Sequence, residues 1–301
     1  MTVQGPGDTA ALLRANRHGI LCMCIAMACF VANDSLVKYA SQTMASAQLV
    51  FIRGVMASIL VLALVRSARA LHQAGEMVRG TVAARAWVDA IATFTYLLAL
   101  FHLPLVNATA IMMTAPLFIA LIAARLMHER VGVGRWCAIV AGFVGVLLVI
   151  QPRAEGFNAW SLVCLGGTVL MAIRDVMTRR IDPGVPSSIV TLATAIAVTL
   201  LSGAVSVVEG WQPFGPFEGA LLAFAALFLA GGYYFIVAGM RHGELSVIGP
   251  FRYSGLLWAV IIGFLVWGEV PNALGWLGIA LVTVSGLYVV YGQRRRANRP
   301  R

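Results

Sequence analysis

The sequence predicts an all-α fold: a polytopic membrane protein of ten transmembrane helices, arranged as two inverted repeats of five helices. Of the 301 residues, 60% are hydrophobic and only 11% are charged, whereas soluble domains carry about 25% charged residues. The apolar residues form continuous runs of about 20, the length that a helix needs to cross a bilayer. The runs do not alternate as the strands of a membrane barrel do. This composition argues against a soluble enzyme, a coiled coil and a disordered chain.

Ten apolar runs give the expected helices in order. The first five runs are 19–39, 46–65, 84–103, 107–127 and 135–151. The second five are 160–179, 187–208, 219–240, 245–267 and 272–292. The first run is too long for the apolar part of a signal peptide, so we expect it to be retained. Residues 1–17 are then a polar N-terminal tail, and residues 294–301 are a basic C-terminal tail.

The positions of the basic residues predict the orientation, because cytoplasmic loops of membrane proteins are enriched in Lys and Arg. Only Lys38 and Arg153 fall on one side of the predicted helices, which makes that side the outer one. The basic residues on the other side are Arg14, Arg17, Arg66, Arg69, Arg79, Arg85, Arg125, Arg130, Arg135, Arg179, Arg180, Arg241, Arg294, Arg295, Arg296, Arg299 and Arg301. We therefore expect a bacterial inner-membrane protein with both termini cytoplasmic. The run Arg294–Arg296 is better explained as a stop-transfer anchor than as a lipid or nucleic-acid patch, and no nucleic-acid partner is expected.

Three pairs of similar segments indicate an internal duplication. Residues 32–34 with Lys38 match 173–175 with Arg179 at a shift of 141, and 99–107 match 238–246 at a shift of 139. Glu129 and Trp136 match Glu269 and Trp276 at a shift of 140. The predicted repeats are residues 18–153 and 154–293. Because five is odd, the two copies have opposite orientations, an architecture typical of transporters.

The motifs within these repeats resemble those of a known family. In the first half they are Ala115-Pro116-Leu117, His128-Glu129-Arg130, Trp136 and Gly142-Phe143-Val144-Gly145, and in the second half Trp267-Gly268-Glu269, Gly275-Trp276 and Ser285-Gly286. Over residues 18–292 the chain resembles the drug/metabolite transporter superfamily, especially its EamA-type exporters and the YddG-type amino-acid exporters among them. The resemblance implies export by alternating access through a cavity formed mainly by helices one, three, four, six, eight and nine. One departure is that Leu256 occupies the position equivalent to Pro116.

Charged residues within the predicted helices call for an explanation, because each costs at least about 2.5–3.5 kcal/mol at the centre of the bilayer. At about 1.5 Å per residue, Asp34 and Arg53 lie at matching depths near the outer face. Asp175 and Arg252 match near the inner face in the same way. We expect each pair to act as a static ion pair that fixes helix register or, alternatively, as a gate. Two further charges complete this set: Arg174, which lies within the membrane, and Asp89, which we expect at the cytoplasmic interface.

Aromatic and flexible apolar residues near the middle of the helices predict the lining of a substrate cavity. The candidates are Tyr96, Met112, Tyr233, Tyr234, Tyr253 and Trp258. A tyrosine within the membrane needs a partner or water for its hydroxyl group, although packing or a lipid-facing position is an alternative for each ring. Pro116 and Pro250 are candidate hinges, because proline removes a backbone hydrogen bond.

The sequence shows no catalytic or cofactor motif. It contains no GxSxG, HExxH, CxxC or P-loop pattern, and we expect neither metal nor cofactor. Cys22, Cys24, Cys29, Cys137 and Cys164 all lie in apolar runs and act as small hydrophobic residues. A membrane enzyme or lipid transferase would need clustered polar residues in its loops, and the loops here are short. We therefore predict a secondary transporter for small metabolites, most plausibly aromatic or other neutral amino acids, with drugs or nucleosides as the alternative cargo. The expected partners are the substrate and the bilayer, with a monomer favoured over an oligomer; facilitative, exchange and ion-coupled transport stay open.

Overall fold

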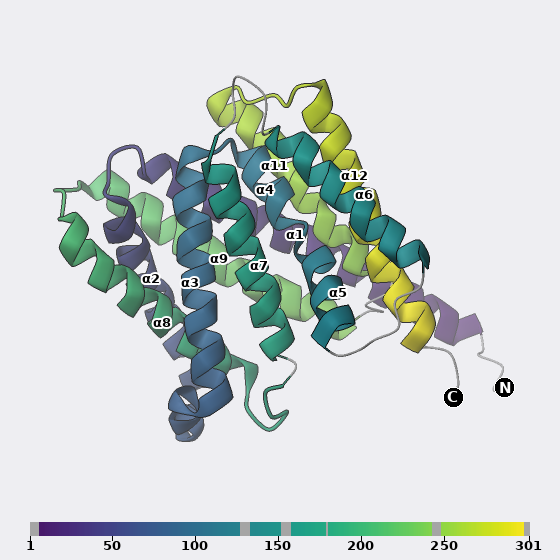
Figure 1. The fold of residues 1–301 in the computed structure, drawn as a ribbon. Coiled ribbons are helices and arrows are strands. Elements are labelled where there is room, and N and C mark those ends of the chain that lie inside the picture. Colours follow the sequence, from purple (N-terminus) through teal and green to yellow (C-terminus); the bar gives the residue numbers. More distant parts are fainter. Residues whose placement is uncertain (1–5, 127–132, 152–157, 179, 243–247, 298–301) are drawn as a thin grey trace.

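The computed structural model describes residues 6–126, 133–151, 158–178, 180–242 and 248–297, and these residues form helices without any strand (Figure 1). Seven of the described helices are long and apolar enough to cross a membrane, and three further apolar helices are shorter. These helices follow the order of the ten apolar runs. The chain is a multi-pass membrane protein.

The described residues of the first half form six α-helices and one 3₁₀ helix. They are α1 (Pro6–Ala40), α2 (Ser46–Ser67), the 3₁₀ helix η1 (Leu71–Val78), α3 (Gly80–His102), α4 (Leu105–Met112), α5 (Ala115–Leu126) and α6 (Val133–Ile150). Helix α1 begins well before the predicted start at residue 19, so much of the expected N-terminal tail is helical. The predicted helix 107–127 is divided into α4 and α5.

The second half follows a similar plan. Its elements are α7 (Trp160–Thr178), α8 (Ser187–Glu209), α9 (Pro216–His242), the 3₁₀ helix η2 (Gly249–Tyr253), α11 (Ser254–Trp267) and α12 (Ala273–Ala297). The beginning of the predicted helix 245–267 lies outside the described residues. Helix α12 includes the first residues of the expected basic tail, and residues 298–301 are not described.

The break between α4 and α5 lies just before the predicted hinge Pro116. The Thr114 hydroxyl donates a hydrogen bond of 2.6 Å to the carbonyl of Ile111, and the Leu117 amide donates one of 2.8 Å to the carbonyl of Thr114. Pro116 is therefore in the first turn of α5, where its missing N–H disrupts no helical bond. Pro250 lies similarly in the first turn of η2.

Helices from the two halves of the chain pack in pairs. Helix α1 packs against α9, α3 against α7, α2 against α8, α6 against α12, and α4 against α11. Glycines allow close contact in several of these pairs. A Cβ atom on Gly145 of α6 would lie 2.9 Å from the carbonyl oxygen of Gly278 on α12, which is an example of the small-residue contacts common between membrane helices.

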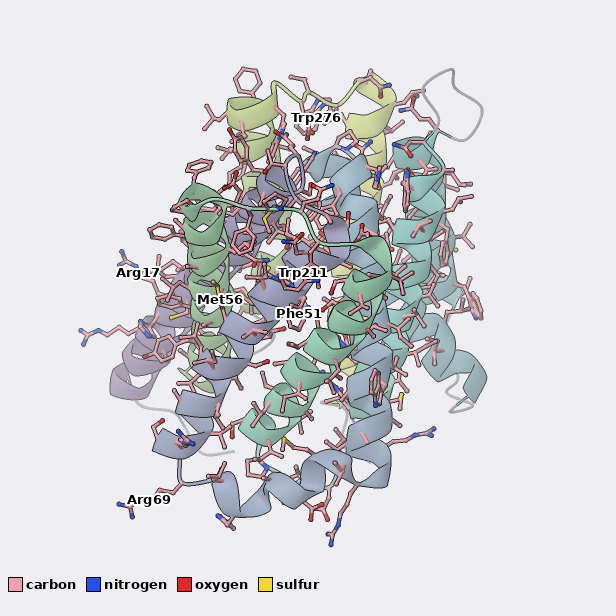
Figure 2. The ribbon with its side chains drawn as sticks, turned by 90° about the vertical axis from the view of Figure 1, so that its left-hand side faces the viewer. Arg17, Phe51, Met56, Arg69, Trp211 and Trp276 are labelled. Carbon is pink, nitrogen blue, oxygen red and sulfur yellow. The ribbon has the colours of Figure 1, made fainter. Side chains whose placement is uncertain are left out.

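Labelled residues mark the two ends of the helix assembly. Trp276, at the start of α12, and Arg69, after α2, lie at opposite ends (Figure 2). Phe51 and Trp211 come together where α2 begins and α8 has ended, with their ring centroids 5.9 Å apart. Below, the end near Lys38, where α1 ends and α4 begins, is called the Lys38 end, and the end near η1 is called the η1 end.

Candidate functional site: a central cavity

A cavity of about 310 Å³ lies among the helices of both halves. Its lining comes from α1, α2, α3, α4, α5, α7, α8, α9, η2 and the start of α11. The lining is mostly apolar, with a few acidic, basic and hydroxyl groups. This combination is typical of small-molecule sites, in which apolar walls supply contact area and a few polar groups fix the orientation of the ligand.

One group of polar residues lies in the cavity a single helical turn from Lys38. The Asn33 side-chain amide donates a hydrogen bond of 2.9 Å to Asp34 Oδ1, and the Tyr96 hydroxyl donates one of 2.9 Å to Asp34 Oδ2. Arg53 Nη1 donates a hydrogen bond of 3.1 Å to Asn33 Oδ1. All four side chains are buried. They are called the Asp34 cluster below.

Asp34 and Arg53 do not form the expected direct ion pair. The two residues do lie in one cluster, but no direct ion pair joins them among the described residues. Asn33 separates them, because its amide oxygen accepts from the guanidinium while its amide nitrogen donates to the carboxylate. Depth along a helix is set by residue number, but the direction of a neighbouring side chain such as Asn33 is not.

A second group of charges lies toward the η1 end. Asp89 accepts from Arg174 at 2.8 Å and pairs with Arg85 at 3.1 Å. Arg174 also pairs with Asp175 at 2.8 Å. These four residues on α3 and α7 are called the Asp89 cluster. The charges of its two acidic and two basic side chains cancel.

The Asp89 cluster corrects one expectation. Asp175 pairs with its neighbour Arg174 and not with Arg252, which is exposed on η2. Asp89 is only 3% exposed and is the buried centre of the cluster, and its depth at the cytoplasmic interface stays a prediction. The long side chain of Arg174 spans the gap between α7 and α3, a reach that counting residues along one helix does not reveal.

A third polar contact lies at the Lys38 end, one helical turn from Asp34. Lys38 Nζ lies 2.6 Å from Glu269 Oε1 and 4.6 Å from the ring centroid of Trp267. Glu269 Oε2 accepts a hydrogen bond of 2.7 Å from the backbone amide of Leu105, at the start of α4. This group, called the Lys38 latch, ties the end of α1 and the start of α4 to the end of α11.

Sequence reasoning missed the latch and the role of Asn33. The Glu269 carboxylate joins α1 to α4, because it pairs with Lys38 and accepts from the first backbone amide of α4. The available signal was that Lys38 is the only lysine in the chain and lies in a predicted membrane helix. A lysine within a membrane helix needs an acidic partner, and the predicted helices place Glu269 at the same end.

The predicted aromatic residues divide into two groups. Tyr96, Tyr233 and Tyr253 line the cavity, as does Met112. Tyr234 is 68% exposed and is not among the lining residues, because consecutive residues on a helix point about 100° apart. Trp258 is also outside the lining and packs between hydrophobic clusters that include residues of α1.

The break in the α4–α5 segment opens onto the cavity, which Met113, Pro116 and Tyr253 all line. The hydroxyl of Tyr253 donates a hydrogen bond of 3.4 Å to the carbonyl oxygen of Met113. This carbonyl group lies at the end of α4, where a helix leaves backbone oxygen atoms without helical partners. The contact joins the broken helix of the first half to the 3₁₀ helix of the second.

The cavity lining is unevenly exposed. The Asp34 cluster is buried, whereas Tyr233 is 46% exposed and Arg252 is exposed. Within the described residues, no three His, Cys, Asp or Glu side chains are grouped as a metal site.

Comparison with known proteins agrees with this architecture. The EamA-like transporter family model matches twice, over residues 17–151 and 158–291. A riboflavin transporter of Rhizobium johnstonii is 27% identical over 74% of this chain and 71% of its own length. A pseudopaline exporter of Pseudomonas aeruginosa is 27% identical over 89% of this chain and 94% of its own. An S-adenosylmethionine uptake transporter of Rickettsia conorii is 24% identical over 89% of this chain and 90% of its own.

A solved crystal structure also shares the fold. It aligns with a TM-score of 0.61 and 17% sequence identity, over 93% of this chain and 99% of the other. At this level of identity the likeness concerns the fold alone. The two family matches together cover most of the sequence, and this chain belongs to the EamA-like transporter family.

Proposed function

We propose that this protein is a secondary transporter that exports small zwitterionic metabolites, with neutral amino acids as the first class, through the central cavity by alternating access. The single observation that carries the proposal is the composition of the cavity. An apolar space of about 310 Å³ holds an acid and a base of the Asp34 cluster that are not paired directly with each other. Such a site suits a molecule with two opposite charges and an apolar side chain.

The named relatives support small organic cargo of more than one kind. They are named for riboflavin, pseudopaline and S-adenosylmethionine. One is named an exporter and another an uptake transporter, so their names do not favour one direction. Export is our proposal from the resemblance to EamA-type exporters.

Two inverted five-helix repeats are the proposed basis of alternating access. Under the shift of about 140 residues, the contact of α1 with α9 is the counterpart of the contact of α7 with α3. The pairs α2 with α8 and α6 with α12 each join a helix to its own repeat counterpart. This pattern of contacts is the one that a twofold relation between the halves would produce, and the double family match supports it. Such symmetry lets one arrangement close either end in turn.

The distribution of arginine residues supports a bacterial inner-membrane location with cytoplasmic termini. In this orientation the Lys38 latch is the outer gate, and the cavity is accessible from the cytoplasm. An exporter in this state is ready to receive its cargo. The Asp89 cluster near the other end is the proposed counterpart that rearranges when the inner side closes.

A flux assay tests the proposal. The purified protein in liposomes is given each of the twenty labelled amino acids in turn, and empty liposomes serve as the control. We expect saturable flux of at least one neutral amino acid. Absence of saturable flux for all twenty would contradict the amino-acid assignment.

A second cargo class, flat aromatic heterocycles, is favoured by the ring-lined cavity and by the relatives named for riboflavin. Tyr233 makes an edge contact with Phe30 at 5.3 Å, and both residues line the cavity. Riboflavin as a competitor in the same assay separates the two classes. Strong competition without amino-acid flux would favour the second class.

A further inference from the structure

The guanidinium of Arg53 pairs with no carboxylate among the described residues, unlike those of Arg85 and Arg174 in the Asp89 cluster. It is 5% exposed and lines the cavity. Its hydrogen bond to Asn33 uses Nη1, and its Nε is buried without a partner in the described part of the chain. Arg174, by contrast, directs Nε, Nη1 and Nη2 to two carboxylates.

A buried guanidinium with open donors is costly, because each charge taken from water needs compensating contacts. The Nε–H and the adjacent Nη2 group form one edge of the guanidinium, and this edge matches the two oxygens of a carboxylate. In Arg53 the contact to Asn33 is made by the other nitrogen, Nη1. The edge suited to a carboxylate is therefore left open by the described residues.

Asp34 provides the opposite charge with spare capacity. Each of its oxygens accepts a single hydrogen bond in the described structure, from Asn33 and from Tyr96. A carboxylate offers about four acceptor positions, so Asp34 has room for an ammonium group. Asp89 differs, because two arginines already neutralise it.

Asn33 is the element that keeps these two charges available. A direct pair between Asp34 and Arg53 would neutralise the charge of each group and so weaken its attraction for a ligand. The amide instead accepts from the guanidinium and donates to the carboxylate. It thereby holds the charges one amide group apart.

We propose that Asn33, Asp34 and Arg53 form a clamp for the amino-acid head group of the substrate. The carboxylate of the substrate binds the open edge of Arg53, and its ammonium group binds Asp34. The side chain of the substrate extends into the apolar remainder of the cavity, where Met112 and Met113 provide adaptable walls. This inference rests on the proposed function and deepens it, since it assigns the head group to one end of the cavity.

Binding of charge-deleted ligands to the full-length protein tests the clamp. The probes are L-phenylalanine, its methyl ester, which lacks the carboxylate, and 3-phenylpropionate, which lacks the ammonium group. Calorimetry measures each affinity for the wild type, Arg53→Gln and Asp34→Asn. Arg66→Gln, on an exposed part of the same helix, is the matched control, and elution on size exclusion checks the fold of every variant.

The wild type should prefer phenylalanine over both analogues by about 10- to 100-fold, the range for hydrogen bonds to charged groups. Arg53→Gln should lose the preference over the ester, and Asp34→Asn should lose the preference over phenylpropionate. Arg66→Gln should keep both preferences. Equal weakening of all three ligands in either clamp variant, or unchanged preferences, would overturn the clamp.

If phenylalanine does not bind, the other nineteen amino acids and their esters are used in the same way. Binding of no amino acid, together with saturable riboflavin flux, overturns the clamp while leaving a transporter of small metabolites intact. Binding of amino acids without the crossed pattern between variants and analogues overturns the clamp but retains the proposed cargo. The two failures are therefore distinguishable.

Discussion

Lys38 and Glu269 lie 2.6 Å apart at one end of the helix assembly, and they join the last turn of α1 to the short segment that follows α11. The side chain of Lys38 is 9% exposed and that of Glu269 is 18% exposed, so water screens this pair only partly. Because Glu269 also accepts from the backbone amide of Leu105, one carboxylate holds three segments together. An opening of this end requires Glu269 to leave at least one of these partners.

Replacement of Glu269 by Gln should weaken the latch and favour opening of the Lys38 end. Glutamine keeps an oxygen for the Leu105 amide but loses the charge that holds Lys38. A shift in the conformational equilibrium of about 5- to 150-fold is the usual range for coupling of this kind. Since Lys38 is the only lysine, a membrane-impermeant amine reagent followed by peptide mass spectrometry measures its exposure directly. We expect faster labelling of Lys38 in the variant.

The control for the latch is Glu76→Gln, which removes a carboxylate from an ion pair with Arg79 in and beside η1, far along the chain from Lys38. Its labelling rate should match that of the wild type. An unchanged rate in Glu269→Gln would show that the ion pair does not hold this end closed.

Replacement of Asp89 by Asn should destabilise the protein more than any exposed acid-to-amide change. The variant leaves Arg85 without its acidic partner and Arg174 with only Asp175. Removing one partner of a buried ion pair costs about 3–5 kcal/mol, although partial exposure of the arginines lowers this figure. Thermal unfolding in detergent measures the effect against Asp182→Asn, an exposed loop residue. Equal melting temperatures for the two variants would refute the structural role of the cluster.

Replacement of Gly145 by Ala should loosen the contact of α6 with α12. The added methyl group would lie 2.9 Å from the Gly278 carbonyl oxygen and also 2.9 Å from Leu281 Cβ. Overpacking of this kind costs about 1–3 kcal/mol. Gly166→Ala provides the comparison, because nothing lies within 4 Å of its added Cβ. We expect a lower melting temperature for Gly145→Ala only, and the same change in both variants would contradict the close helix contact.

Much of the fold follows from the sequence, because the length of an apolar run sets where a membrane helix can be. The side-chain partners do not follow in the same way. Run length fixes the depth of Asp34 and Arg53 but not the direction of Asn33, whose amide separates them.

The same limit explains the other differences. Tyr233 and Tyr234 are neighbours in sequence, yet only Tyr233 lines the cavity, since one residue rotates the side chain by about 100°. The partner of Asp89 is Arg174 on another helix. Contacts between helices far apart in the chain depend on tertiary packing, which hydrophobic periodicity alone does not encode.

Counterflow in proteoliposomes tests the central claim most directly, namely that this cavity carries a zwitterion across the membrane. Liposomes loaded with an unlabelled neutral amino acid are placed in a trace of the labelled one, with wild type, Arg53→Gln and Arg66→Gln compared at equal protein. The account predicts transient accumulation of label with the wild type and with Arg66→Gln, and an initial rate reduced at least about 10-fold by Arg53→Gln. Equal accumulation with Arg53→Gln, or none with the wild type for any neutral amino acid, would contradict it.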